Sequence, residues 1–103
     1  MGTFDIHIAH VQVEDGKYRP VVILFEEESL VAIYKITSQY EGKSEAIRKH
    51  YIVISDWKEA GLLKPSYIDM VKVYKIPIVS LSGAPIGMLS LKDREALIAA
   101  MLS

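Results

Sequence analysis

The sequence predicts a mainly β fold, a small and partly open β-barrel that ends in one C-terminal helix. Five or six short strand-like runs with close turns between them fill most of the chain, and the only long helical pattern lies at its end. The strand–helix–strand alternation of nucleotide-binding folds is missing. The length of 103 residues suits one domain, so we expect a single domain over residues 1–103.

The expected strands are apolar runs, most of them rich in β-branched residues. Residues 21–25 (VVILF) form a continuous apolar run, which is typical of a strand buried on both faces. The polar residues 26–29 separate this run from residues 30–37, and this pairing predicts a β-hairpin. The expected strands cover residues 4–13, 21–25, 30–37, 51–54 and 67–76.

Two shorter segments lie between or after these strands. Residues 56–61 predict a single helical turn, with Ser55 or Asp56 as its N-cap. Gly61 is expected to end that turn, because glycine adopts the left-handed conformation that stops helices. Residues 80–87 are expected to form turns, since they contain the turn-forming residues Gly83, Pro85 and Gly87.

The C-terminal helix is expected over residues 91–102. Ser90 and Asp93 form a capping-box pattern at its start, in which each residue can satisfy a free backbone group of the first turn. The helix carries an apolar stripe that we expect to pack on the sheet, formed by Leu97, Ile98, Met101 and Leu102.

The overall composition excludes several classes of protein. The formal net charge of −1 argues against tight non-specific binding of nucleic acid, but it leaves room for a local basic groove that holds a few nucleotides. The chain has no cysteine, which excludes disulfides, thiolate nucleophiles and cysteine-based metal sites. No glycine-rich phosphate loop is present, and the three histidines lack the spacing of a zinc site, so we expect neither a cofactor nor a metal ion.

The N-terminal residues indicate where the protein acts. Residues 1–5 lack the basic start and the apolar stretch of a signal peptide. No apolar run approaches the roughly 20 residues that a membrane-spanning helix needs. We therefore expect a cytoplasmic protein without a membrane partner.

The predicted hairpin brings an arginine and a hydroxyl group together. In an antiparallel hairpin, opposed residues have numbers with a constant sum, so Arg19 lies opposite Ile36 if Phe25 faces Leu30. If Phe25 faces Val31 instead, Arg19 lies opposite Thr37. Either register places Arg19 beside Thr37 at the open end of the hairpin, unless a β-bulge changes the pairing.

Four blocks of the chain resemble one family of bacterial toxins. Residues 15–24 (DGKYRPVVIL) resemble the signature of the MazF/PemK toxins, in which a basic loop leads into Arg-Pro and an apolar strand. Residues 36–38 (ITS) resemble the second signature of that family, a strand that ends in a catalytic Thr or Ser. Residues 55–66 (SDWKEAGLLKPS) resemble a subgroup of these toxins, and residues 86–90 (IGMLS) resemble the closing segment of the family. The blocks stand in the family's order and cover nearly the whole chain.

This resemblance implies a fold, an activity and partners. The implied fold is an SH3-like β-barrel of the MazF/PemK/CcdB type with a C-terminal helix, usually found as a homodimer. The implied activity is that of a type II toxin, a metal-independent endoribonuclease that cleaves single-stranded RNA and that a cognate antitoxin inhibits. The family's essential arginine falls on Arg19 and its hydroxyl residue on Thr37, in agreement with the hairpin geometry.

Metal-free cleavage of RNA by the ribose 2′-OH needs a charged group at the phosphate, a proton acceptor and a proton donor. Arg19 suits the first role, while Thr37 can orient a phosphate oxygen or the 2′-OH, with Ser38 as a supplement. Arginine and threonine are poor acids and bases at neutral pH, so the acid–base pair stays open. His10 is the first histidine to test, and Lys17 is a further supporting candidate.

Two other functions stay open at this stage. A small barrel of this kind can be catalytically silent and bind a partner protein or a nucleic acid, since a fold does not fix a function. A toxin of the same fold group can instead act on a protein target such as a topoisomerase. An assay of RNA cleavage separates both alternatives from the endoribonuclease.

Overall fold

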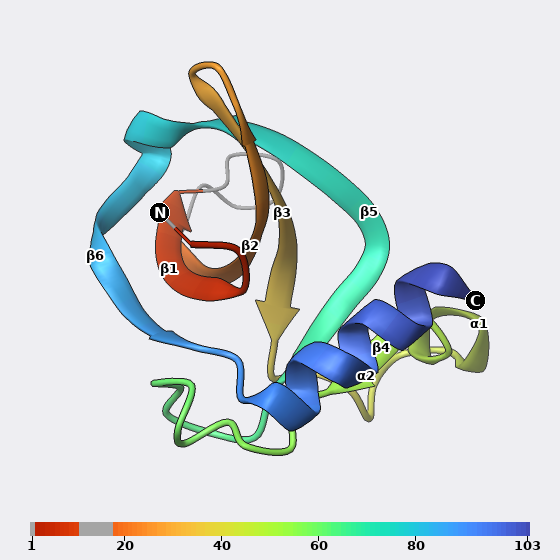
Figure 1. Ribbon diagram of the computed structural model, residues 1–103. Helices are drawn as coiled ribbons and strands as arrows, with labels where there is room; N and C mark the ends of the chain where they lie inside the picture. Colours follow the sequence, from red (N-terminus) through yellow and green to blue (C-terminus); the bar gives the residue numbers. More distant parts are fainter. Residues whose placement is uncertain (1, 11–17) are drawn as a thin grey trace.

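The computed structural model describes residues 2–10 and 18–103. Its six strands form one antiparallel sheet, in the order β4-β5-β3-β2-β1-β6, which curls into a partly open barrel (Figure 1). The fold class predicted from the sequence is therefore confirmed. In chain order, the elements are β1 (Asp5–His10), β2 (Tyr18–Glu27), β3 (Leu30–Thr37), α1 (Glu45–Arg48), β4 (Tyr51–Val53), β5 (Tyr67–Pro77), a 3₁₀ turn (Ile78–Ser80), β6 (Leu81–Met88) and α2 (Leu91–Leu102).

One strand contradicts the prediction. Residues 80–87 were expected to form turns, but Leu81–Met88 is strand β6, at the edge of the sheet beside β1. Between the pairs Ile6–Gly87 and Ile8–Ser82 the pairing shifts, so that residues 83–86 of β6 lie opposite the single residue His7 of β1. An edge strand tolerates the missing N–H of a proline, and glycine often marks such an irregularity. The turn-forming residues thus make a bulge inside a strand. The short helix α1 was not predicted.

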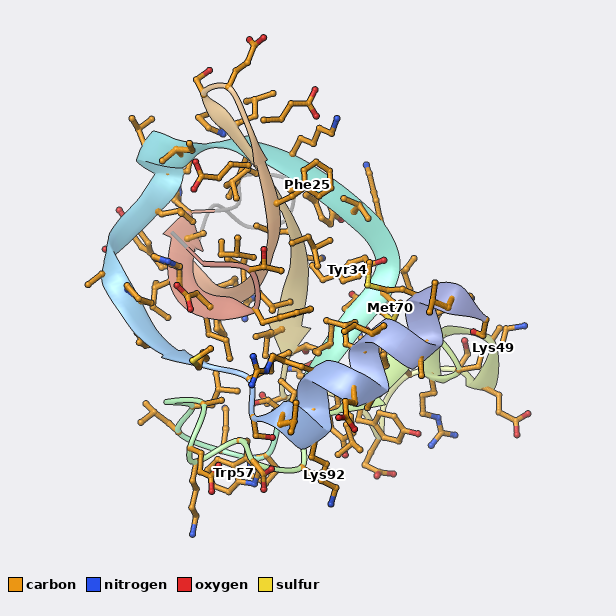
Figure 2. The ribbon with its side chains drawn as sticks, viewed as in Figure 1. Phe25, Tyr34, Lys49, Trp57, Met70 and Lys92 are labelled. Carbon is orange, nitrogen blue, oxygen red and sulfur yellow. The ribbon has the colours of Figure 1, made fainter. Side chains whose placement is uncertain are left out.

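The core lies on both faces of the sheet. Even-numbered residues of β2 and β3, such as Val22 and Tyr34, belong to a buried cluster that also contains Leu97 of α2. Odd-numbered residues, such as Val21 and Ile33, belong to a second cluster on the opposite face. Figure 2 shows Tyr34 and Met70 between the sheet and α2. Burial on both faces explains why the sequence of these strands is continuously apolar.

A β-bulge sets the register of the β2–β3 hairpin. Near the turn Phe25 faces Ala32, so neither register expected from the sequence holds there. The pairing then shifts between Ile23 and Phe25, and beyond this bulge Val21 faces Lys35. The same register, continued by two residues, puts Arg19 opposite Thr37. At the open end of the hairpin, the bulge therefore restores the predicted register in which Arg19 lies opposite Thr37.

The start of α2 is tied to the turn at residues 56–61. Ser90 Oγ accepts a hydrogen bond from Asp93 N (3.2 Å), which confirms the capping residue. Asp93 is buried, and its carboxylate accepts hydrogen bonds from Ser55 N and Asp56 N, each 2.9 Å long. The expected cap by Ser55 or Asp56 does not form within the described residues, because Asp56 Oδ2 accepts a hydrogen bond from Ser90 Oγ instead (2.6 Å). Ala60 N donates to Asp56 O (3.1 Å), and the turn ends at Gly61 with φ +86°, as predicted.

The apolar stripe of α2 packs only in part. Leu97 is fully buried, but the exposed fractions of Ile98, Met101 and Leu102 are 42%, 47% and 82%. Asp93 and Leu97 lie four residues apart and define the buried side of the helix, so Leu97 is the one member of the stripe that this side contains. In the part of the chain that the structure describes, no helix is long and apolar enough to cross a membrane.

Two glycines hold the turn at residues 56–61 against strand β6. A Cβ atom on Gly61 would lie 2.2 Å from Ile86 O, and one on Gly87 would lie 2.2 Å from Ala60 O. Side chains at these positions would force the two backbones apart. This contact fixes the start of the segment that follows Gly61.

His7 provides a test of the packing on the second face. It lies opposite Val21, is 4% exposed, and neither ring nitrogen has a hydrogen-bond partner within residues 2–10 and 18–103. Since burying unsatisfied polar atoms costs free energy, His7→Leu is expected to raise the free energy of unfolding by about 1 kcal/mol. Urea unfolding of both proteins measures the change. A lower midpoint for the variant would show that the imidazole stabilises the core.

Candidate functional site

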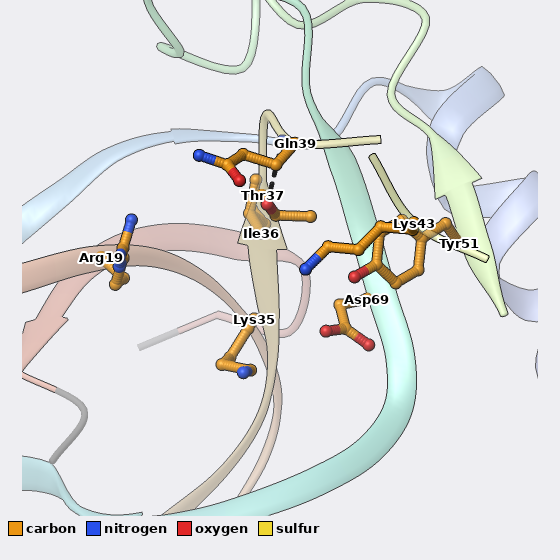
Figure 3. A pocket seen from close by; sticks show the side chains of 8 residues that line it. All are labelled: Arg19, Lys35, Ile36, Thr37, Gln39, Lys43, Tyr51 and Asp69. Atoms are coloured by element: carbon orange, nitrogen blue, oxygen red, sulfur yellow. Dashed lines mark hydrogen bonds between the residues drawn. The ribbon is translucent and has the colours of Figure 1, made fainter. Parts of the chain in front are cut away.

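Arg19 and Thr37 line one cavity at the end of the β2–β3 hairpin. The cavity has a volume of about 140 Å³, and Figure 3 shows Arg19 on one side of β3 and the side chains of Lys43, Tyr51 and Asp69 on the other. The full lining consists of Arg19, Lys35, Ile36, Thr37, Gln39, Lys43, Tyr51 and Asp69. The structure therefore brings together the two residues that the sequence singled out.

Strand pairing explains why these side chains meet. Lys35 and Thr37 are two residues apart on β3, so they lie on the same face of the sheet. On β5, Asp69 pairs with Lys35, and on β4, Tyr51 pairs with Asp69. The row Lys35–Asp69–Tyr51 thus crosses three neighbouring strands on the face where Arg19 and Thr37 end the hairpin.

The cavity carries a local excess of positive charge. Three of its lining residues are cations, Arg19, Lys35 and Lys43, and its lining contains one carboxylate, Asp69. Lys35 and Lys43 also line an adjoining hollow together with Lys72, which extends the basic surface along β5. The chain as a whole has a formal net charge of −1, so this concentration of cations is local. Such a groove attracts phosphate groups without making the protein a general nucleic-acid binder.

The hydroxyl group of Thr37 has a defined orientation. Its Oγ1 accepts a hydrogen bond from Gln39 N at 3.0 Å (Figure 3). Because this bond uses a lone pair of the oxygen, the hydroxyl proton remains available for donation to a ligand. Thr37 is therefore prepared to donate a hydrogen bond to an anion that Arg19 binds.

A larger and more apolar cavity opens beside Arg19 and Thr37. Its volume is about 500 Å³, and it shares Arg19, Ile36, Thr37 and Gln39 with the first cavity. Apolar side chains contribute much of the rest of its wall: Ile8, Tyr18, Pro20, Leu62, Leu63 and Ile86. A ligand that carries both a phosphate and a planar apolar group could occupy the two cavities at once.

Aromatic stacking supports the loop that follows β3. The rings of Tyr40 and Tyr67 are stacked with a centroid distance of 4.4 Å and an interplanar angle of 15°. Arg48 lies over the Tyr40 ring at 5.3 Å from the centroid. These contacts join the loop to β5 and α1, and the loop in turn carries Gln39 and Lys43 into the cavity.

The supporting candidates have different outcomes. Ser38 lines the larger cavity beside Thr37. His10 packs against Tyr18, with 5.2 Å between the ring centroids, and lines neither cavity. Lys17 lies outside the described residues. Of the two candidates within the described residues, the structure brings Ser38 to the cavities and leaves His10 outside them.

Sequence reasoning missed Lys35, Lys43, Tyr51 and Asp69. Strand alternation alone could have identified Lys35, because it stands two residues before Thr37 in the same strand. Asp69 and Tyr51 become neighbours of Lys35 only through the pairing of β5 with β3 and β4, which no local pattern reveals. Among residues 2–10 and 18–103, no three His, Asp or Glu side chains are grouped as metal ligands.

The fold resembles solved structures of toxins, whereas no protein-family model and no curated protein matches the chain. The MazF-mt6 toxin of Mycobacterium tuberculosis is 29% identical, with a TM-score of 0.69 over 94% of this chain and 91% of the toxin. An Mtb toxin is 25% identical, with a TM-score of 0.64 over 91% of this chain and 94% of that toxin. A mycobacterial endoribonuclease, solved in complex with its cognate antitoxin, has a TM-score of 0.67 over 96% of this chain and 86% of the endoribonuclease chain. Its sequence is only 10% identical to this chain, so this similarity shows a shared fold alone.

Proposed function

We propose that this chain, which belongs to the MazF-like family of toxins, is an endoribonuclease that cleaves single-stranded RNA without a metal ion. The observation that carries this proposal is the shared cavity of Arg19 and Thr37. The guanidinium of Arg19 and the oriented hydroxyl group of Thr37 can both bind a bridging phosphate, and the neighbouring lysines add positive charge. We also propose that residues 1–103 form one toxin domain.

In the proposed reaction, the ribose 2′-oxygen attacks the adjacent phosphorus and displaces the 5′-oxygen. Arg19 stabilises the negative charge that builds up on the phosphate oxygens, because its guanidinium stays charged and can donate two hydrogen bonds at once. Thr37 donates a further hydrogen bond to the phosphate. Its Oγ1 already accepts the hydrogen bond from Gln39 N, which leaves the hydroxyl proton for the substrate. The products are a 2′,3′-cyclic phosphate and a 5′-hydroxyl.

The two cavities support RNA as the substrate. The first cavity and its lysines suit the sugar–phosphate backbone, while the apolar cavity beside them suits a base that is not paired. Both cavities meet at Arg19 and Thr37, so a base that enters the larger one would flank the phosphate in the smaller one. A base held within a duplex could not enter in this way, which favours single-stranded RNA.

Tyr18 tests this use of the larger cavity. It is 65% exposed and lines the larger cavity but not the smaller one. Stacking of a base on an aromatic ring contributes about 1–3 kcal/mol, so Tyr18→Ala is expected to raise the KM for RNA on the order of tenfold with little change in kcat. Steady-state kinetics on a fluorogenic oligonucleotide measure both constants. Tyr18→Phe keeps the ring and should behave as the wild type; an unchanged KM in the alanine variant would rule out stacking at this position.

The proposal includes two protein partners. The endoribonuclease among the structural neighbours was solved with its cognate antitoxin, and we propose that a cognate antitoxin also inhibits this chain in the cytoplasm. We further propose a homodimer. Exposed apolar side chains that a second copy could cover include Val53, Val71, Ile98 and Met101. Sedimentation equilibrium tests this stoichiometry.

The most direct test of the function uses RNA of random sequence. Purified protein is incubated with single-stranded RNA in the presence of EDTA, and the ends of the fragments are sequenced to find the cleaved bond. We expect cleavage that EDTA does not reduce. Complete inhibition by EDTA would contradict the proposed mechanism. A lack of cleavage together with tight binding to a small partner protein would instead support a catalytically silent barrel.

A further inference from the structure

The proposed reaction lacks a proton acceptor among the residues predicted from the sequence. A guanidinium and a threonine hydroxyl group are both poor bases, so neither Arg19 nor Thr37 suits this role. His10, the histidine favoured by the sequence, lines neither cavity. Asp69 lines the smaller cavity, and its carboxylate is the lining group that can most readily accept a proton.

We propose that Asp69 is the general base that removes the proton from the attacking 2′-OH. The inference deepens the proposed function and rests on it. Asp69 pairs with Lys35 across β3 and β5, while Thr37 lies two residues further along β3 on the same face. Asp69 is therefore a diagonal neighbour of Thr37, at a spacing of about 7–8 Å between Cα atoms, which a bound ribose can bridge.

The position of Asp69 relative to Arg19 suits an in-line displacement. Strands β2 and β5 flank β3 on opposite sides, so the backbones that carry Arg19 and Asp69 are about 10 Å apart. A phosphate above Thr37 would then have a carboxylate on one side and a guanidinium on the other (Figure 3). In an in-line displacement the base lies on the side of the attacking 2′-oxygen, away from the leaving 5′-oxygen, so Asp69 can reach the 2′-OH while Arg19 binds the phosphate oxygens.

The proton and electron changes of the step balance. Asp69 takes the proton of the 2′-OH as the bond between the 2′-oxygen and phosphorus forms. The bond between phosphorus and the 5′-oxygen breaks, and that oxygen takes a proton from water. Arg19 stabilises the negative charge that develops on the phosphate. Loss of its new proton to water then returns Asp69 to the carboxylate form.

Asp69 has a fixed orientation. Its Oδ1 accepts a hydrogen bond from Val71 N at 2.9 Å, which leaves Oδ2 for the substrate. The charged and titratable groups that line the cavities around it come from every neighbouring element: Arg19 of β2, Lys35 of β3, Lys43 of the following loop, Tyr51 of β4, and Lys72 and Tyr74 of β5. The cations among them outnumber the carboxylate, so an RNA phosphate can approach Asp69.

The test compares Asp69→Asn with the wild type on an oligonucleotide that contains the mapped cleavage site. Asparagine keeps an oxygen for the hydrogen bond with Val71 N but is not a base. We expect kcat to fall by about 10²- to 10⁴-fold. We also expect the wild-type pH–rate profile to show an acidic limb, in which activity rises as one proton is lost, and we expect the variant to lack this limb.

Two control variants separate a catalytic role from a structural one. Glu27→Gln removes a carboxylate that pairs with Lys75 outside the cavity, and it should leave kcat unchanged. Tyr51→Phe keeps the ring beside Asp69 and removes only the hydroxyl group, and it should retain the acidic limb. Thermal unfolding of each variant confirms that it is folded.

The outcomes distinguish this inference from the proposed function. If the wild type cleaves RNA and Asp69→Asn cleaves it within threefold of the same rate, or retains the acidic limb, Asp69 is not the base and the endoribonuclease stands. If the wild type cleaves no RNA, both proposals are wrong. Loss of activity together with loss of the acidic limb supports Asp69 as the base.

Discussion

Arg19→Ala is expected to lower kcat/KM for RNA by about 10³- to 10⁵-fold, the range found when an arginine that stabilises a phosphoryl transition state is removed. The side chain lines both cavities and approaches the proposed phosphate position from β2. Its removal leaves Lys35 and Lys43, which are point charges without the two-pronged geometry of a guanidinium. Single-turnover cleavage of a labelled oligonucleotide measures the loss.

Two further variants test whether charge or geometry matters at position 19. Arg19→Lys keeps the charge and is expected to recover only part of the activity, because lysine cannot bind two phosphate oxygens in parallel. Arg94→Ala removes an arginine of α2 that lines none of the cavities, and it should cleave RNA at the wild-type rate. If Arg19→Ala keeps more than a tenth of the activity, the cavity is not the site of cleavage.

Asp93→Ala is expected to lower the free energy of unfolding by about 3 kcal/mol, the largest stability effect that we predict for a side chain outside the site. The buried carboxylate of Asp93 accepts hydrogen bonds from Ser55 N and Asp56 N, and the variant would leave both N–H groups without this acceptor. It would also remove the side chain that lies 3.3 Å from Ser90 Oγ at the start of α2. For a domain of this size, the melting temperature should fall by more than about 10 °C.

The same helix supplies the control for this stability prediction. Glu95→Ala changes an exposed carboxylate two residues after Asp93 and should alter stability by less than about 0.5 kcal/mol. Asp93→Asn keeps one oxygen acceptor and should give an intermediate loss. Differential scanning calorimetry compares the three variants. An Asp93→Ala protein that melts with the wild type would mean that these hydrogen bonds contribute nothing to folding.

The sequence was sufficient to predict the fold class and the central hairpin, because the alternation and the apolar runs of strands follow directly from burial. It was not sufficient for the edge strand β6. Glycine and proline are common both in turns and in β-bulges, so Gly83 and Pro85 do not tell the two apart. It also failed for the packed side of α2. There the buried Asp93, which binds backbone groups far away in the sequence, decides how the helix faces the sheet.

Two residues that line the smaller cavity, Arg19 and Thr37, could be predicted in a comparable way. Arg19 and Thr37 come together through one local hairpin, and the resemblance to MazF/PemK toxins pointed to the same pair. Asp69 and Lys43 reach the cavity through β5 and through a loop whose position depends on the stacking of Tyr40. Such long-range pairing leaves no periodic signal in the sequence, so these residues could be found only from the structure.

Chemical analysis of the cleavage products tests the central claim most directly. An oligonucleotide with the mapped site is cleaved in EDTA, beside a copy that has one 2′-deoxyribose on the 5′ side of the cleaved bond, and mass spectrometry identifies the new ends. If the cavity of Arg19 and Thr37 directs attack by the 2′-oxygen, the first RNA yields a 2′,3′-cyclic phosphate and a 5′-hydroxyl, and the second stays intact at that bond. Cleavage of the deoxy-substituted bond, or products that carry a 5′-phosphate, would contradict it.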